Sequence, residues 1–381
     1  MASQRHGSAY RPELDVVRFL AFLFVFLHHE LPRSPHLERT GGISCIFGDQ
    51  GWRLLTSLAN ACGMGLCLFF TLSAYLITNL LLQERECNGT ISVKKFYFRR
   101  VLRIWPLYLQ GISIGIVWAL IHHQSSQTTS FIWYLLMAGN IYCATHGWID
   151  NPMTPLWSIS IEEQFYLVWP WAMRWLSRRC LQICALFFIL VANTTLFLMG
   201  QKHADVEFAV WANTFVQFEM FAVGILLALL KKPKVRGWVS IAPGLILIGP
   251  ALWFVACYFF HVKHPSAEGG AISGMALMLG YGLIALGCAC VLHGFCIMGP
   301  APMPKWAASL GKISYGLYVY HLLIIKNTKF VYEYFFHPRS IVTILLALGL
   351  TILVAKLSYA FFERPFMMYK KRFEIIHAKE I

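Results

Sequence analysis

Long runs of apolar residues, separated by short polar stretches, dominate this 381-residue chain. A membrane-spanning helix needs about 20 mainly apolar residues, and about eleven segments approach that length. The candidate segments are 14–31, 61–82, 100–121, 131–145, 156–174, 181–199, 208–230, 238–260, 270–292, 306–325 and 340–362. The largest polar stretches are 32–60, 83–99 and the tail from Arg364.

One candidate differs from the others, because segment 131–145 is short and contains Gly139 and Asn140. We interpret it as a re-entrant or interfacial helix rather than a span. The pattern therefore predicts an all-α, polytopic membrane helical bundle with about ten transmembrane helices. The connections are short, so residues 1–381 form a single integral membrane domain with a polar tail from about residue 366.

Composition excludes most other classes of protein. Hydrophobic residues make up 57% of the chain and charged residues 13%, where soluble domains carry about 25% charged residues. The net charge of +14 raises the possibility of nucleic-acid binding. However, the basic residues form short clusters between apolar runs, which is typical of cytoplasmic loops. We expect a lipid bilayer as partner and no nucleic acid.

These basic clusters orient the helices. They lie around Arg11, Arg100, Arg178, Lys232 and Lys370, whereas the loop 122–130 contains neither Lys nor Arg. With the clusters inside and that loop outside, both termini are cytoplasmic. The sequence thus predicts a multi-pass protein of the cell (inner) membrane. The eleven cysteines are scattered through apolar runs without the paired spacing of a metal site, so we expect no metal.

Ionisable residues inside spans are costly and usually functional or paired. His29 lies about 22 Å along a helix that starts at Leu14 on the cytoplasmic side. Glu162 near the start of its span and His321 late in its own are expected at a similar depth. Each also has a simpler interpretation: an interfacial histidine, a helix-terminal charge, and a packing partner of Tyr318. Their convergence at one depth favours a site in which the carboxylate tunes an imidazole.

A second candidate site is expected near the cytoplasm. Arg100 and Arg103 are spaced i, i+3 and so share one helix face. Two aligned guanidiniums bind phosphate oxygens in a bidentate manner. Snorkelling of both side chains onto lipid headgroups is the alternative.

Six motifs occur in order along the chain. They are Arg18 with His29 ten intervening residues later, the Phe69–Ile77 stretch, Arg100-x-x-Arg103, Trp157-Ser158-x-x-x-Glu162-x-x-Phe165-Tyr166, Ser314-Tyr315-x-x-Tyr318-x-x-His321, and Glu363-Arg364-Pro365. Together they resemble the acyltransferase-3 family of integral membrane acyltransferases. The resemblance covers residues 11–365, nearly the whole chain.

This resemblance implies an acyl-CoA-dependent O-acyltransferase. It would move an acyl group, usually acetyl, from cytoplasmic acyl-CoA to a hydroxyl of an extracytoplasmic or membrane-associated acceptor, above all a cell-envelope glycan. Acyl-CoA is then a donor substrate, and no tightly bound cofactor is expected. Many members carry a C-terminal SGNH hydrolase-like domain; this sequence ends at Ile381, so we expect a stand-alone member.

Roles for individual residues follow from combining the motifs with the charge map. We expect Arg18, Arg100 and Arg103 to hold the CoA phosphates. His29 is expected to act as a general base or as a transient acyl carrier, and Glu162 to orient or polarise it. The expected substrate-binding residues are Ser158, Ser314, Tyr318 and His321.

Two other functions stay open. The acceptor can be a small secreted molecule such as an antibiotic, as in some members of the family. Alternatively, His29 and Glu162 can form the proton relay of a proton-coupled transporter. The absence of a visible internal repeat disfavours the transporter, since transporter halves often show symmetry.

Overall fold

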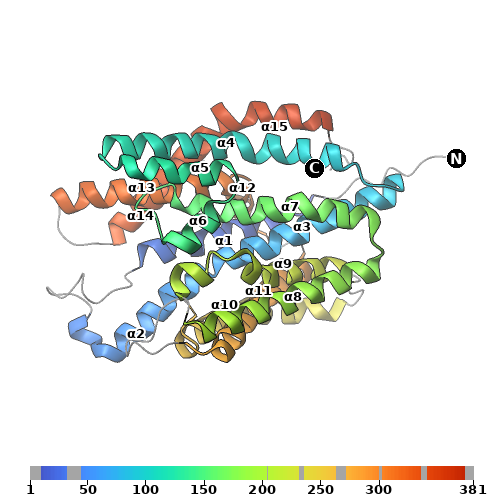
Figure 1. The fold of residues 1–381 in the computed structure, drawn as a ribbon, viewed down its shortest axis with the longest axis horizontal. Helices are drawn as coiled ribbons and strands as arrows, with labels where there is room; N and C mark the ends of the chain where they lie inside the picture. Colours follow the sequence, from blue (N-terminus) through green and yellow to red (C-terminus); the bar gives the residue numbers. More distant parts are fainter. Residues whose placement is uncertain are drawn as a thin grey trace.

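The computed structural model describes residues 10–31, 44–203, 205–230, 236–262, 272–299, 303–335 and 341–373, and these residues contain helices and no strand (Figure 1). The α-helices are α1 (Pro12–Glu30), α2 (Ser44–Gly63), α3 (Gly65–Asn88), α4 (Val93–Ile121), α5 (Ser130–Leu135), α6 (Gly139–His146), α7 (Trp157–Trp175), α8 (Arg178–Gln201), α9 (Thr214–Leu229), α10 (Ala242–Phe259), α11 (Gly274–Met298), α12 (Lys305–Lys312), α13 (Ser314–Phe335), α14 (Ile341–Ser358) and α15 (Arg364–Lys370). Short 3₁₀ or π turns are η2 (Ser125–Thr129), η3 (Thr154–Leu156), η4 (Val206–Val210), η5 (Arg236–Ile241), η6 (Tyr359–Glu363) and η7 (Lys371–Phe373). The prediction of an all-α protein is confirmed for the described residues.

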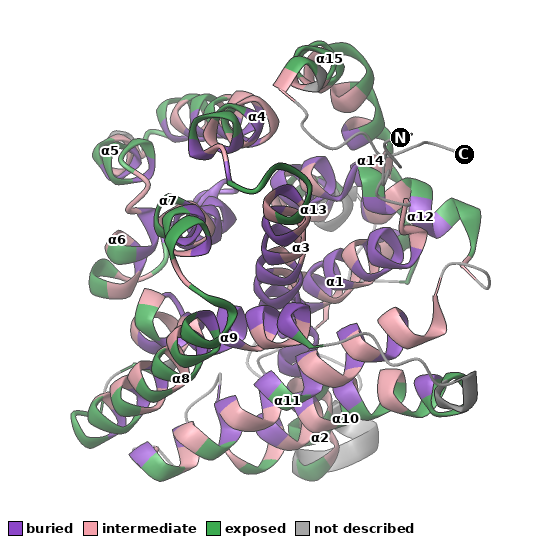
Figure 2. Ribbon diagram, turned by 90° about the vertical axis from the view of Figure 1, so that its right-hand side faces the viewer, coloured by how far each residue is buried: buried purple, intermediate pink, exposed green. Residues whose placement is uncertain are grey.

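Helices α1 and α3 occupy the centre of the bundle. Helices α4, α13, α14 and α15 lie on one side of them and α8, α9, α10 and α11 on the other (Figure 1). Figure 2 shows buried residues concentrated on the central helices and exposed residues on the outward faces of α4, α5 and α8. Many of these outward residues are large and apolar: Leu190 is 62% exposed, Leu247 73% and Phe361 80%. A surface of this kind is stable against lipid and not against water, so the bundle is a membrane protein.

Six stretches within the described residues are long and apolar enough to cross a membrane. They are Gln50–Asn88, Val93–Ile121, Arg178–Gln201, Val239–Phe259, Gly274–Met298 and Ile341–Lys370. The expected spans on α1, α7 and α9 do not meet that standard: α1 and α7 carry several charged residues, and α9 has 16 residues. The count of ten spans and the cytoplasmic termini therefore stay predictions.

Two expected segments differ from the structure, and a third, 131–145, agrees with the expectation that it does not span the membrane. The stretch 32–60 was expected to be a polar connection, but α2 begins at Ser44 and continues almost directly into α3. Segment 306–325 was expected to be one span and is divided at Ile313 into α12 and α13. Segment 131–145 forms two short helices, α5 and α6, neither of which is long enough to cross a bilayer.

Polar groups define where several helices start and end. Ser177, Asn213 and Ser273 accept hydrogen bonds from backbone N–H groups in the first turns of α8, α9 and α11. At the end of α7, Arg85 donates hydrogen bonds to the carbonyl oxygens of Met173 (3.0 Å) and Leu176 (2.8 Å). A cation at a helix C-terminus also interacts favourably with the helix dipole. Many basic residues thus have structural partners, which makes the exceptions informative.

Two close helix contacts hold the central helices in place. A Cβ atom at Gly224 of α9 would overlap the backbone of Thr71 and lie 2.8 Å from the Cβ of Ala74, both in α3. A Cβ at Gly311 of α12 would overlap the backbone of Asp15 in α1. Glycine lets the backbones approach at both points. The contact at Gly311 fixes the first half of α1, one turn from Arg18.

Candidate functional site

The first candidate site is a cavity with about 820 Å³ of empty space, its opening included. We call it the arginine cavity, because Arg18 from α1 and Arg100 and Arg103 from α4 all line it. Its other lining residues come from α3, α4, α7 and α13: Leu66, Phe69, Leu72, Ser73, Leu76, Ile77, Ile104, Ser158, Ile159, Glu162, Tyr166, Ser314, Tyr315 and Tyr318. The structure therefore brings together the three predicted CoA-binding residues with Glu162, Ser158, Ser314 and Tyr318.

The guanidiniums of α4 are available to an incoming anion. Arg100 packs over the rings of Tyr166 (5.2 Å to the centroid) and Phe96 (5.6 Å). Neither Arg100 nor Arg103 has a hydrogen bond or an ion pair with a described residue. The neighbouring Arg99, by contrast, pairs with Glu84 at 2.8 Å. Two half-buried guanidiniums without an ion pair have the chemistry to bind phosphate groups, and that role stays a prediction.

Arg18 is held at the same cavity by its own helix. Its Nη1 lies 2.5 Å from Oδ1 of Asp15, one turn earlier on α1. The hydroxyl of Tyr10 donates a second hydrogen bond to Asp15 Oδ2, at 2.8 Å. Asp15 is thereby fixed between two donors, and it orients Arg18 toward the arginine cavity.

Glu162 lies in the arginine cavity, among the guanidiniums. Its Oε2 accepts a hydrogen bond from the hydroxyl of Tyr166 at 2.8 Å, and that hydroxyl also contacts Ser73. No hydrogen bond joins Glu162 to His29, and the two residues line different cavities. The expected action of Glu162 on the imidazole of His29 therefore has no direct contact to act through. What the position of Glu162 does provide is a carboxyl group near Arg100.

His29 lines a second cavity, with about 940 Å³ of empty space including its opening, which we call the histidine cavity. It occupies the last turn of α1, where Lys329 Nζ donates a hydrogen bond to its carbonyl oxygen at 3.0 Å. The imidazole of His28 borders the same cavity but is buried, with Nδ1 2.7 Å from the carbonyl oxygen of Ala59. His28 thus ties α1 to α2, whereas the half-buried His29 faces the cavity.

His321 lies behind His29 and lines neither cavity. It is fully buried, its ring centroid is 5.2 Å from that of His29, and Phe22 packs edge-on at 6.3 Å. His321 Nδ1 is 2.5 Å from the carbonyl oxygen of Tyr318, so Nδ1 carries the proton in the neutral ring. His321 Nε2 is buried and has no hydrogen-bond partner among the described residues. His321 therefore packs against His29, and its role in substrate binding stays a prediction.

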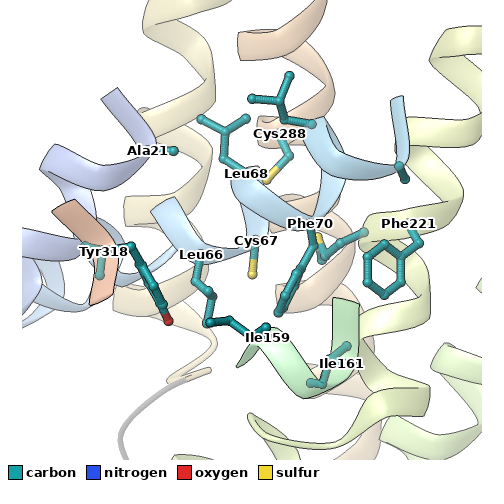
Figure 3. Packing of buried hydrophobic residues seen from close by; sticks show 14 of the residues in the cluster. Ala21, Leu66, Cys67, Leu68, Phe70, Ile159, Ile161, Phe221, Cys288 and Tyr318 are labelled. Carbon is teal, nitrogen blue, oxygen red and sulfur yellow. The ribbon is translucent and has the colours of Figure 1, made fainter. Parts of the chain in front are cut away.

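Leu66 and Tyr318 line both cavities, so the two cavities adjoin at these side chains, which we call the constriction. The hydroxyl of Tyr318 lies 2.7 Å from Ser158 Oγ and donates a hydrogen bond to the carbonyl oxygen of Pro155 at 3.0 Å. Figure 3 shows Tyr318, Leu66 and Ile159 next to one another in the packed interior. A ligand that extends from the arginines to His29 would lie against both Leu66 and Tyr318.

Several residues of the two cavities were not expected as site residues. Ser73, Tyr166 and Tyr315 line the arginine cavity, and each lies inside a motif that the sequence shows. The histidine cavity also contains Trp148, Trp157, Trp211, Glu207 and Lys326. Trp157 belongs to one of the motifs. Trp148, Trp211 and Glu207 come from the connections between α-helices, and Lys326 lies within α13, beyond the motif that ends at His321.

Comparison with known proteins agrees with the resemblance. The sequence model of an acyltransferase domain, that of acyltransferase family 3, matches residues 11–362. Among curated proteins, the chain is 26% identical to the peptidoglycan O-acetyltransferase OatA of Listeria monocytogenes over 399 residues, which cover 97% of the chain and 58% of that protein. It is 25% identical to the putative peptidoglycan O-acetyltransferase YrhL of Bacillus subtilis, with 97% of the chain and 58% of that protein covered. A putative O-acetyltransferase of Staphylococcus aureus is 26% identical, with 94% of the chain and 57% of that protein covered.

The chain spans somewhat more than half the length of these curated relatives. No solved structure matches it. The two cavities and the constriction are therefore described from this structure alone.

Proposed function

This chain belongs to the acyltransferase-3 family, and we propose that it is a membrane O-acyltransferase that moves an acyl group, above all acetyl, from acyl-CoA to a hydroxyl acceptor. One observation carries the proposal. A cavity lined by three guanidiniums and a cavity lined by the imidazole of His29 share two lining residues, Leu66 and Tyr318. Such an arrangement suits a long anionic donor whose phosphates lie in one cavity and whose reactive end reaches the base in the other.

The arginine cavity is the proposed site of the donor. CoA carries several phosphate charges, which match Arg18, Arg100 and Arg103. Three guanidiniums outweigh the one carboxylate of Glu162, so the cavity keeps a net positive charge. Glu162 repels a phosphate from its own position, which helps to set the orientation of the donor. The pantetheine arm then runs along the apolar wall of Leu66, Phe69 and Ile159 toward the constriction.

At the constriction, His29 is the proposed general base. Its imidazole removes the proton of the acceptor hydroxyl, the oxygen attacks the thioester carbonyl carbon, and the C–S bond breaks as the tetrahedral intermediate collapses. The imidazolium returns the proton to the departing CoA thiolate. Products are an acyl ester and free CoA, and His29 is neutral again.

The acceptor class comes from the relatives. Two of them are named as peptidoglycan O-acetyltransferases, one of these putatively. We therefore propose a cell-envelope glycan as acceptor, presented to the histidine cavity from the face of the membrane opposite the donor. The basic residues at the arginine end support a cytoplasmic location for that end, where acyl-CoA is found.

Replacement of His29 by alanine tests the proposal. We expect His29→Ala to lower acetyl transfer to purified peptidoglycan by about 10²- to 10⁴-fold, as is usual on loss of a general base. Acetyl-CoA binding should stay within about two-fold of the wild type, because His29 lies beyond the constriction.

His28→Ala is the matched control, since it removes the adjacent imidazole. It should reduce stability, through loss of the contact with Ala59, more than it reduces the rate per folded molecule. Near wild-type transfer by His29→Ala, together with loss in His28→Ala, would mean that the other histidine is the base.

A further inference from the structure

The histidine cavity has walls that the chemistry of His29 does not require. Trp148, Trp157 and Trp211 line it together with Glu207 and Lys326. Acid–base catalysis at His29 needs an imidazole and a path for the hydroxyl, and it needs none of these indoles. Concave sites that combine aromatic walls with a few placed polar groups are typical of ligand recognition.

Trp148 is presented by a firmly held loop. The loop starts at Gly147 with φ of +82°, and Asn151 Nδ2 donates a hydrogen bond to the carbonyl oxygen of Gly115 in α4 at 2.9 Å. Thr154 Oγ1 closes the loop by donating to the carbonyl oxygen of Ile149 at 2.6 Å. The indole of Trp148 is 36% exposed, and its centroid is 5.5 Å from that of the buried Trp157. The loop thus offers an ordered aromatic surface at the mouth of the cavity.

Glu207 supplies an uncommitted carboxylate on another wall. Asp205 Oδ1 accepts hydrogen bonds from the backbone N–H groups of Glu207 (2.7 Å) and Phe208 (3.1 Å), which fixes the start of η4. The side chain of Glu207 has no hydrogen bond or ion pair with any described residue. Its oxygens are therefore open to a ligand.

Lys326 is already engaged, in contrast to Glu207. Its Nζ lies 2.5 Å from Oδ1 of Asp150, and this hydrogen bond holds the pKa of the Asp150 carboxyl below its usual value. Because Lys326 is paired with Asp150, Glu207 is the uncompensated one of these two charges. The histidine cavity therefore disfavours an anionic ligand, unlike the strongly basic arginine cavity.

We propose that the histidine cavity is a subsite for an uncharged saccharide, whose pyranose ring stacks on Trp148 and whose adjacent hydroxyls donate hydrogen bonds to Glu207. The inference rests on the proposed acyl transfer and specifies its acceptor. One face of a pyranose ring is made of C–H groups and packs against an aromatic surface. A carboxylate has two acceptor oxygens, which match a pair of vicinal hydroxyls. An acidic sugar is repelled by Glu207.

Binding measurements on the purified full chain in detergent test the subsite. The probes are chitopentaose and maltopentaose as neutral saccharides, pentagalacturonate as an acidic one, and choline as a small cation. We expect a neutral pentasaccharide to bind to the wild type by calorimetry. Trp148→Ala and Glu207→Gln should each weaken that binding by about 10-fold, the loss typical of one aromatic or charge-assisted contact.

A matched control comes from Trp133 in α5. Its exposed fraction of 40% is similar to the 36% of Trp148, and it lines neither cavity. Trp133→Ala should leave saccharide binding unchanged. All three variants should bind acetyl-CoA like the wild type, which also shows that they are folded.

Three results would overturn the subsite. They are failure of the wild type to bind either neutral saccharide, binding of choline or pentagalacturonate that depends on Trp148, and equal saccharide affinity in wild type and Trp148→Ala. If His29-dependent transfer persists alongside any of them, the proposed function stands and only its acceptor subsite is wrong. Loss of the proposed function itself would appear separately, as transfer that does not depend on His29.

Discussion

Removal of the two guanidiniums of α4 tests the donor site in the most quantitative way. Arg100 and Arg103 line the arginine cavity without an ion-pair partner among the described residues, so their replacement breaks no ion pair. A hydrogen bond to a charged group contributes about 1.5–3 kcal/mol. Each alanine variant should therefore bind acetyl-CoA about 10- to 100-fold more weakly, at about 1.4 kcal/mol per factor of ten.

The double variant should lose less than the product of the two single losses. Both side chains lie i, i+3 on one helix face and can contact the same phosphate groups, so their contributions are coupled. Arg103→Lys should recover only part of the affinity, because a point charge does not reproduce the planar fork of a guanidinium.

Calorimetry in detergent gives the affinities, with two controls. Lys94 and Lys95 lie exposed on the same helix, and the double variant Lys94→Ala/Lys95→Ala removes the same formal charge without touching the cavity. Acetyl-pantetheine carries no phosphate, and its binding should not respond to the arginine variants. Unchanged acetyl-CoA affinity in Arg100→Ala/Arg103→Ala, or an equal loss in the lysine variant, would refute a specific phosphate site.

Three further outcomes are expected. Arg99→Leu should lower the free energy of unfolding by about 3–5 kcal/mol, because it leaves the buried Glu84 unpaired; thermal unfolding checks this, and a loss below about 1 kcal/mol would contradict it. Leu66→Ala should widen the constriction. The ratio of the transfer rate with butyryl-CoA to that with acetyl-CoA should then rise by about 10-fold, as is typical of an enlarged apolar pocket. An unchanged ratio of rates would show that Leu66 does not limit acyl size. An impermeant maleimide added to intact cells should label a cysteine placed at Gln124 and spare the exposed Cys87; the reverse labelling would invert the topology.

The sequence predicted the helical bundle and the arginine cluster well. Apolar runs of about 20 residues mark helices directly, since the backbone in lipid must satisfy its own hydrogen bonds. The i, i+3 spacing of Arg100 and Arg103 fixes their common face, and the cavity confirms that they share it. Helix α2 was missed, because the polar residues Asp49 and Arg53 gave its segment the character of a loop.

Depth along a helix did not predict which residues meet. Glu162 was placed at the level of His29, but the constriction of Leu66 and Tyr318 lies between the two cavities that these residues line. A residue count gives the height of a side chain and leaves its direction around the helix and the tilt of the helix undetermined. The break at Ile313 adds a further change of direction before His321.

The aromatic wall of the histidine cavity had no readable signal. Trp148 lies in a loop, and Trp211 follows a π turn, so neither belongs to a periodic pattern. Their proximity to His29 results from hydrogen bonds that fold the connections, such as the one from Asn151 to Gly115. Long-range contacts of this kind become visible only in the folded chain.

Transfer across a sealed bilayer tests the two-cavity account most directly. Labelled acetyl-CoA is trapped inside proteoliposomes, and peptidoglycan fragments are supplied only outside. Mixed orientation does not matter, because only molecules with the arginine cavity facing the lumen meet the donor. The account predicts acetylated glycan outside the vesicles with the wild type and none with His29→Ala. Acetylation that occurs only when donor and acceptor are on the same side would contradict it.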